Sequence, residues 1–418
     1  MINWSRYPLW LLGLSATQAG AVLVFLSFAG ALPIFQAEWA LSNTQAGIIQ
    51  AAGQVGYLLA VLVSSSLTDY VIPKHLIVGG AIWAGVSNLA FVFFANGFTS
   101  AMILRAFIGI GVAFIYMPGV KFISQHIPSA QRGRAVGLFV ASFTLGSAAS
   151  IALGGNLASI LGWQLAFALM SIGPLAGALI SWRTLPKAES QDFRREEPVP
   201  FSELLKNQPA VLVILLYICH AWEVLGIRSW LAAYLTAVGV QNGASLAAAT
   251  RSGAMVTGLA TLAAATATAS VASLSDRFGR KMIIIAVMAI SLFATSFLGL
   301  TFTFPWLLVV LVSLVAAFFA NADSAVISTS LTEVVPSNYL GRTLAIYSFL
   351  GFAAGSISPF IFGAALDFAN SLDTNTLGGF VSPWSWGFAT LALGSLVGLL
   401  VAVIFNRSRV VPNDSSQE

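Results

Sequence analysis

The chain has 418 residues, of which 58% are hydrophobic and only 8% are charged. Soluble globular domains carry roughly 25% charged residues, so this composition excludes a soluble domain and a disordered chain and indicates a membrane protein. The net charge of +4 reflects orientation in the membrane rather than an anionic partner, so no nucleic-acid partner is expected. The single cysteine, Cys219, excludes intrachain disulfides and cysteine-based metal sites, and three scattered histidines do not suggest zinc, so we expect no metal and no cofactor.

Apolar stretches of about 20 residues, each long enough to cross a hydrocarbon core roughly 30 Å thick, recur along the whole chain. Twelve such spans are predicted, at residues 9–34, 43–67, 76–96, 99–124, 134–159, 163–184, 209–238, 246–275, 281–302, 306–332, 342–367 and 384–405. Because these runs are continuous rather than alternating, they exclude a β-barrel. The first run is too long for a cleavable signal peptide. The fold class predicted from these runs is an all-α membrane protein with twelve transmembrane helices.

Lysine and arginine are distributed unequally between the two sides of these spans. If the N-terminus is cytoplasmic, 15 of the 19 basic residues fall in inside segments, none falls in an outside loop, and the other four lie within spans. Cytoplasmic loops of membrane proteins are enriched in lysine and arginine. We therefore expect a multi-pass protein of the cytoplasmic (inner) membrane with both termini in the cytoplasm.

The chain divides into two similar halves. Its most polar interior stretch follows the sixth span and is interpreted as a solvated linker, or alternatively as a short amphipathic surface helix. The loop Pro128–Arg134 after the fourth span matches Pro336–Arg342 after the tenth at an offset of 208 residues. Two halves with repeated cytoplasmic loops indicate a carrier that works by alternating access. The predicted domains are an N-terminal six-helix bundle (1–185), a linker (186–208), a C-terminal six-helix bundle (209–406) and a cytoplasmic tail (407–418).

The loop after the eighth span carries the most specific motif, Leu274-Ser-Asp276-Arg277-Phe-Gly279-Arg280-Lys281. It resembles the loop signature G-x-L-x-D-R-x-G-R-[RK] of the major facilitator superfamily of secondary transporters, and the resemblance extends over essentially the whole chain. A weaker copy after the second span keeps Asp69 but lacks the following arginine and the Gly-Arg pair. The resemblance implies two pseudo-symmetric six-helix bundles and a cytoplasmic gate formed by Asp69, Asp276, Arg277, Gly279 and Arg280. The alternative is that these basic residues only set the orientation of the chain.

The fourth span contains a second motif, Arg105-Ala-Phe-Ile-Gly109-Ile-Gly111. It resembles the family pattern R-x-x-x-G-x-G, which implies a buried arginine tied to substrate or proton handling. In the fifth span, residues 146–150 read Gly-Ser-Ala-Ala-Ser, where the proton/drug antiporters of this family carry a Gly-Pro pair. The missing proline disfavours that subgroup.

Ionisable side chains at membrane depth are the main candidates for function, because each costs at least about 2.5–3.5 kcal/mol unless it is paired or hydrated. The candidate proton-coupling residues are Glu223 and His220, one turn apart on the seventh span, and Asp323 on the tenth. The candidate substrate-binding residues are three arginines and two aromatic residues near them: Arg105, Arg228, Arg251, Tyr116 and Trp230. Structural alternatives remain open: an ion pair between Glu223 and Arg251, hydrogen bonds from Asp323 to Asn321 or Ser324, and plain packing for His220 and the aromatic residues.

The balance of these charges guides the choice of substrate. Three deep arginines against two carboxylates favour a small anionic solute such as an organic acid, because guanidinium groups recognise carboxylates and phosphates. We expect a secondary transporter driven by protons, surrounded by membrane lipids and monomeric, and not an enzyme. No G-x-x-x-x-G-K-[ST] motif is present, so a built-in ATPase motor is excluded. The alternatives are proton-coupled efflux of drugs or other metabolites, a ligand-binding membrane sensor without translocation, and a channel.

Overall fold

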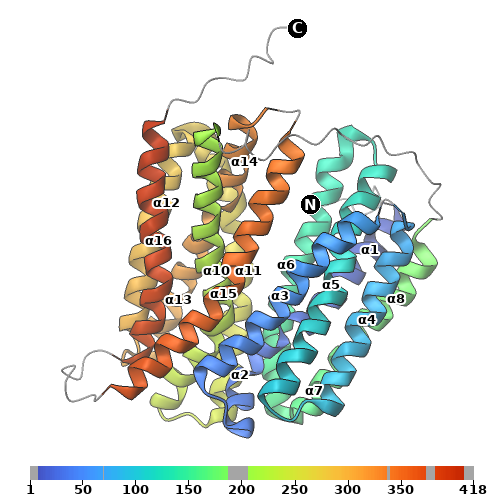
Figure 1. The fold of residues 1–418 in the computed structure, drawn as a ribbon. Helices are drawn as coiled ribbons and strands as arrows, with labels where there is room; N and C mark the ends of the chain where they lie inside the picture. Colours follow the sequence, from blue (N-terminus) through green and yellow to red (C-terminus); the bar gives the residue numbers. More distant parts are fainter. Residues whose placement is uncertain (1–7, 69, 187–205, 337–338, 373–381, 409–418) are drawn as a thin grey trace. The chain divides into compact units, whose positions relative to one another are not determined.

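A computed structural model describes residues 8–68, 70–186, 206–336, 339–372 and 382–408 (Figure 1). All regular secondary structure in these ranges is helical. Twelve helical segments within them are long and apolar enough to cross a membrane, which confirms the predicted number of spans. Three of these segments are each built from two helices, because the first, sixth and tenth spans are interrupted near their middle.

The chain separates into two compact units, Met1–Arg194 with Leu231–Leu262, and Arg195–Trp230 with Ala263–Glu418. Two long helices, α10 (Gln208–Gln241) and α11 (Leu246–Phe278), contribute to both units. The other helices of the first unit are α1 (Leu9–Phe25), α2 (Ser27–Trp39), α3 (Asn43–Leu67), α4 (Pro73–Phe94), α5 (Phe98–His126), α6 (Ser129–Leu161), α7 (Trp163–Met170) and α8 (Ile172–Thr184). Those of the second unit are α12 (Arg280–Leu300), α13 (Trp306–Ala322), α14 (Ser324–Val334), α15 (Leu340–Ser371) and α16 (Pro383–Arg407). The division into bundles at 1–185 and 209–406 stays a prediction.

In the first unit, α5 lies between α3 and α4 and packs closely against both (Figure 1). A side chain at Gly109 would lie against the backbone of Gly53 in α3, and one at Gly111 would lie against Ala84 in α4. The two glycines of the R-x-x-x-G-x-G motif therefore mark the close approach of α5 to its two neighbours. Small residues are the usual means of bringing transmembrane helices together.

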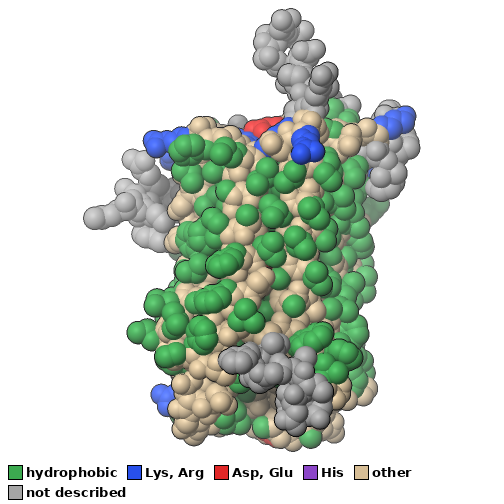
Figure 2. All heavy atoms as spheres, turned by 90° about the vertical axis from the view of Figure 1, so that its left-hand side faces the viewer, with side chains coloured by type: hydrophobic (Ala, Val, Ile, Leu, Met, Phe, Trp, Pro, Cys, Tyr) green, Lys and Arg blue, Asp and Glu red, His purple; other side chains and the backbone are tan. Residues whose placement is uncertain are grey.

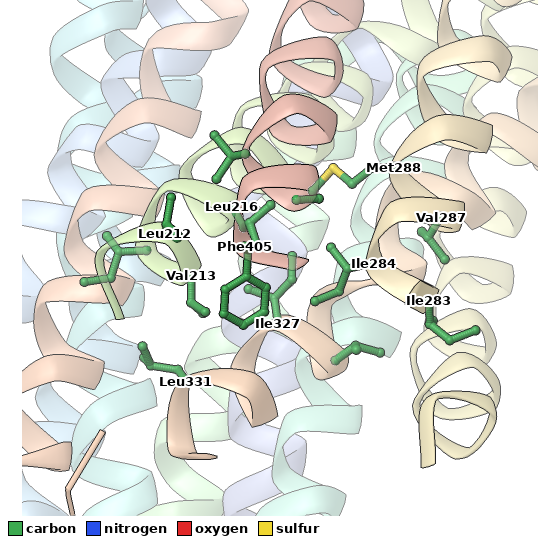
Figure 3. Packing of buried hydrophobic residues seen from close by; sticks show 14 of the residues in the cluster. Leu212, Val213, Leu216, Ile283, Ile284, Val287, Met288, Ile327, Leu331 and Phe405 are labelled. Atoms are coloured by element: carbon green, nitrogen blue, oxygen red, sulfur yellow. The ribbon is translucent and has the colours of Figure 1, made fainter. Parts of the chain in front are cut away.

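The second unit has an apolar core at one end of its helices (Figure 3). Leu212, Val213 and Leu216 of α10 pack there with residues of α12, α14 and α16, including Ile284, Ile327 and Phe405. Apolar side chains also cover the middle of the face seen in Figure 2, where most of the visible charged side chains gather at the upper end. A face that is apolar between polar ends is typical of a protein whose solvent is lipid.

In each unit a lysine near the start of one helix donates to a carbonyl group at the C-terminal end of another helix. Lys74 of α4 donates from Nζ to the carbonyl oxygen of Leu185, just after α8, at 2.6 Å, and its ammonium lies over the ring of Trp182. Lys281 of α12 donates to the carbonyl oxygen of Ser408, just after α16, at 2.8 Å. The last carbonyl groups of a helix have no partner within the helix, and a cation at this end is favourable.

Replacing Gly109 by alanine is predicted to destabilise the protein. The new methyl group would meet the Gly53 carbonyl oxygen, so α3 and α5 would have to separate, at a cost of about 1–3 kcal/mol. Gly137→Ala is the matched control, because a side chain at this helical position meets nothing within 4 Å. Thermal unfolding in detergent should show a lower midpoint for Gly109→Ala alone, and equal midpoints would contradict the packing described for α5.

Candidate functional site

The second unit contains a buried pair of titratable side chains. His220 of α10 and Asp323, between α13 and α14, form a hydrogen bond of 2.7 Å between Nδ1 and Oδ1. Their residues are 6% and 3% exposed. The imidazole ring also stacks on Tyr217, which in turn stacks on Tyr347. This hydrogen bond between an imidazole and a carboxyl group connects α10 to the tenth span.

Asp323 occupies a break in the tenth span. The helix stops at Ala322 and restarts at Ser324, and the carbonyl oxygen of Asn321 accepts a hydrogen bond from Thr268 of α11 at 3.1 Å. The sequence placed Asp323 within a continuous span and offered Asn321 or Ser324 as hydrogen-bonding partners. The carboxylate instead bonds to His220, 103 residues earlier in the chain.

Glu223 lies one turn after His220 on α10 and is 2% exposed. Its Oε1 atom accepts hydrogen bonds from Ser291 at 2.9 Å and Thr295 at 2.6 Å, both on α12. All three residues predicted for proton coupling therefore belong to one unit, and two of them are in direct contact. Sequence analysis missed the two hydroxyl groups, although two hydroxyl residues four positions apart in an apolar span are a usable signal for a polar contact.

Arg105 is also buried, with 3% of its surface exposed, but it contacts backbone. Its Nη1 donates to the carbonyl oxygen of Val24 at 2.9 Å, and its Nη2 donates to that of Phe25. These carbonyl groups lie where α1 ends and α2 begins. Ser150 of α6 donates to the neighbouring carbonyl oxygen of Leu23 at 2.6 Å. Both terminal nitrogens of the arginine predicted to bind substrate are therefore occupied by the interrupted first span.

The other predicted substrate-binding residues differ in what they contact. Trp230 is fully buried, donates from Nε1 to the carbonyl oxygen of Pro359 at 2.9 Å, and stacks on Phe362. Tyr116 is half-buried against aromatic rings of α6. Arg228, in the second unit, is half-buried, and Arg251, in the first, is exposed. Neither guanidinium group has a hydrogen bond or an ion pair with any residue that the structure describes.

Arg280 organises the loop motif after α11. Its Nε donates to Glu333 at the end of α14 at 2.6 Å, and its Nη1 lies 3.2 Å from Asp276. Gly279 connects α11 to α12 with a φ of +86°, a conformation that favours glycine. Arg277 is exposed, and Asp69 lies outside the described residues. Glu333 was missed by the sequence analysis, although it is the acidic residue nearest the end of the tenth span.

Uncharged polar side chains form a further group that the sequence analysis missed. Both amide atoms of Gln18, Nε2 of Gln50 and Oε1 of Gln54 are buried without a hydrogen-bonding partner among the described residues. All three residues belong to the first unit, on α1 and α3. Among the described residues, no group of three or more His, Cys, Asp or Glu side chains is arranged to hold a metal ion. Glutamines within apolar spans could have indicated these buried polar groups, but the sequence analysis considered only ionisable side chains.

Curated relatives of this chain are transporters. The Hexuronate transporter of Bacillus subtilis is 24% identical over 381 residues, which cover 83% of this chain and 87% of that protein. The chloroplastic Ascorbate transporter of Arabidopsis thaliana is 25% identical over 228 residues, which cover 50% of this chain and 41% of that protein. These relatives confirm that the chain is not an enzyme.

Solved structures share the fold. A bacterial homolog of the human lysosomal transporter Spinster, in an inward-facing and occupied conformation, matches with a TM-score of 0.76 and 16% identity over 96% of both chains. A D-xylose-proton symporter matches with a TM-score of 0.72 and 20% identity, over 96% of this chain and 98% of that chain. The family model described as Major Facilitator Superfamily matches residues 14–268 and 243–418. These matches confirm the predicted fold, and the chain belongs to the major facilitator superfamily of transporters.

Proposed function

We propose that this transporter works by alternating access, moves a small anionic solute, and couples that movement to protons. The observation that carries the proposal is the buried His220–Asp323 hydrogen bond with Glu223 one turn away. A proton added to or removed from this group changes the charge at a depth where ionised side chains are costly. It also changes which of His220 and Asp323 donates in their hydrogen bond, so protonation is linked to a contact between helices.

Arg251 and Tyr116 of the first unit, and Arg228 of the second, remain separate candidates for contact with the substrate. Both arginines lack a hydrogen-bonding or ionic partner among the described residues, and a guanidinium group presents five N–H donors suited to a carboxylate. Relatives named for hexuronate and ascorbate support an oxygen-rich anion as the solute. The buried amides of Gln18 and Gln50 add hydrogen-bonding capacity for hydroxyl groups of such a solute. Arg105 and Trp230 are assigned to holding backbone and packing instead.

The proposal includes the orientation of the chain. We place it in the inner membrane with both termini in the cytoplasm, on the basis of the distribution of lysine and arginine. The contacts of Arg280 with Asp276 and Glu333 then lie on the cytoplasmic side and belong to the gate. The predicted six-helix bundles 1–185 and 209–406 are the parts that would move against each other.

Glu223→Gln and Asp323→Asn are expected to abolish uphill, proton-driven uptake while leaving counterflow of substrate across proteoliposomes. Each amide keeps the size of the side chain but cannot exchange a proton. Glu38→Gln, which changes an exposed carboxylate at the end of α2, is the control and should keep both activities. Retention of full uphill transport by both site variants would contradict coupling at this site.

Small carboxylates are expected to raise the unfolding temperature of the purified protein more than neutral sugars or lipophilic cations do. A ligand at a hundredfold excess over its Kd stabilises the folded state by about 2.7 kcal/mol. Arg228→Gln and Arg251→Gln should lose this shift with little change in the unliganded protein. Arg105→Gln should instead lower the unfolding temperature without ligand, because it leaves two carbonyl groups of the first span unpaired. A shift only with lipophilic cations would overturn the anionic substrate.

A further inference from the structure

An apolar groove of about 400 Å³ lies along α4 and α5 in the first unit. Its volume falls within the range of small-molecule pockets. Leu76, Gly79 and Gly80 of α4 line it together with Ile110 and Phe114 of α5. It is separate from the titratable pair His220–Asp323, which belongs to the second unit. The groove offers hydrocarbon contact and has no role in the proposed transport mechanism.

Two consecutive glycines hollow out the groove. A side chain at Gly80 would meet the Gly111 carbonyl oxygen and Phe114, so Gly80 allows α4 and α5 to approach each other. A side chain at Gly79 would meet nothing within 4 Å, so this position opens into free space. The sequence Gly79-Gly80 thus brings the helices together on one side and leaves a depression beside the contact.

The groove is long enough to hold most of a lipid chain in one leaflet. It extends from His75, at the start of α4, to Trp83, eight residues later. At 1.5 Å per residue, this distance is about 12 Å along the helix. One leaflet contributes about 15 Å of a hydrocarbon core roughly 30 Å thick. The indole N–H of Trp83 is already donated to the Phe107 carbonyl oxygen at 2.9 Å, so this end of the groove offers an occupant no free donor.

Basic side chains lie at the end of the groove where α4 begins. His75 is exposed, and its ring centre lies 6.2 Å from that of Trp182. The ammonium group of Lys74 lies over the ring of Trp182. Arg183, which follows Trp182 in the sequence, is exposed. Basic residues and tryptophan at the end of an apolar span are typical of the level of the lipid head groups, where they attract anionic lipids.

We infer that the groove binds one acyl chain of an anionic phospholipid, whose head group lies at Lys74, His75 and Arg183. The acyl chain of the lipid fills a depression that no side chain of α4 or α5 occupies. The bilayer supplies this ligand at high concentration. The phospholipid would cover the contact between α4 and α5 at Gly80. This makes the groove a specific lipid site in addition to the general lipid-facing surface.

Native mass spectrometry of the full-length protein, released from nanodiscs of phosphatidylglycerol and phosphatidylcholine in equal amounts, tests the inference. The wild-type protein should retain phosphatidylglycerol in preference to phosphatidylcholine. Gly79→Leu fills the groove from α4 and should lower this retention severalfold, because the leucine side chain takes the space of the bound acyl chain. Gly137→Leu places the same side chain at another open helical position and should retain lipid as the wild type does.

Charge reversal and crosslinking test the two parts of the site separately. His75→Glu combined with Arg183→Glu should remove the preference for phosphatidylglycerol over phosphatidylcholine. Phosphatidylglycerol with a photoreactive acyl chain should crosslink to peptides that contain residues 75–83 or 107–114. Equal retention by Gly79→Leu and Gly137→Leu, or crosslinks confined to other helices, would overturn the inference. Equal retention of both lipids by the wild type would overturn the anionic head group.

Discussion

The structure depends on the need to pair every backbone N–H and C=O group in a region without water. An uninterrupted helix meets this need by itself, but an interrupted one leaves groups unpaired. The three interrupted spans meet it with side chains from neighbouring helices. Arg105 and Ser150 bond to carbonyl groups at the end of α1, Asn88 bonds to the junction of α7 and α8, and Thr268 bonds to the end of α13. These polar side chains therefore stabilise the interruptions, because they supply hydrogen bonds that the broken helices cannot make themselves.

The internal repeat separates what the fold needs from what is specific to this transporter. Lys74 and Lys281 lie at equivalent places, each in the first turn of a helix and each bonded to the carbonyl group after another helix. The buried charges are not repeated. The position 208 residues before Asp323 is Ile115, and the position 208 residues after Arg105 is Ser313. The lysine cap therefore occurs in both copies of the repeat, whereas Asp323 and Arg105 each occur in only one.

The spans were predictable because the length of an apolar run is a local property of the sequence. The close contacts of Gly109 were open to prediction for a similar reason, since small residues mark helix contacts. Contacts between side chains of different helices could not be predicted, because periodicity shows on which face of a helix a residue lies but not which residue of another helix it contacts. Glu223 was considered as an ion-pair partner for an arginine, and its carboxylate accepts from the hydroxyl groups of Ser291 and Thr295. The break at the end of α1 has no proline at its position to reveal it, so the sequence did not indicate that Arg105 contacts backbone.

The chemistry of the groups at two of these breaks suits different tasks. Arginine stays charged under all physiological conditions, so Arg105 can hold the carbonyl groups of the first span at every stage of a transport cycle. At the tenth span the side chain beside the break is Asp323, and its partner is His220. The hydrogen bond between these two side chains joins α10 to the tenth span at this break. One break is thus held by a guanidinium group on two backbone carbonyl oxygens, whereas the other is bridged to a neighbouring helix by a pair of side chains, so the two breaks are stabilised by different chemistry.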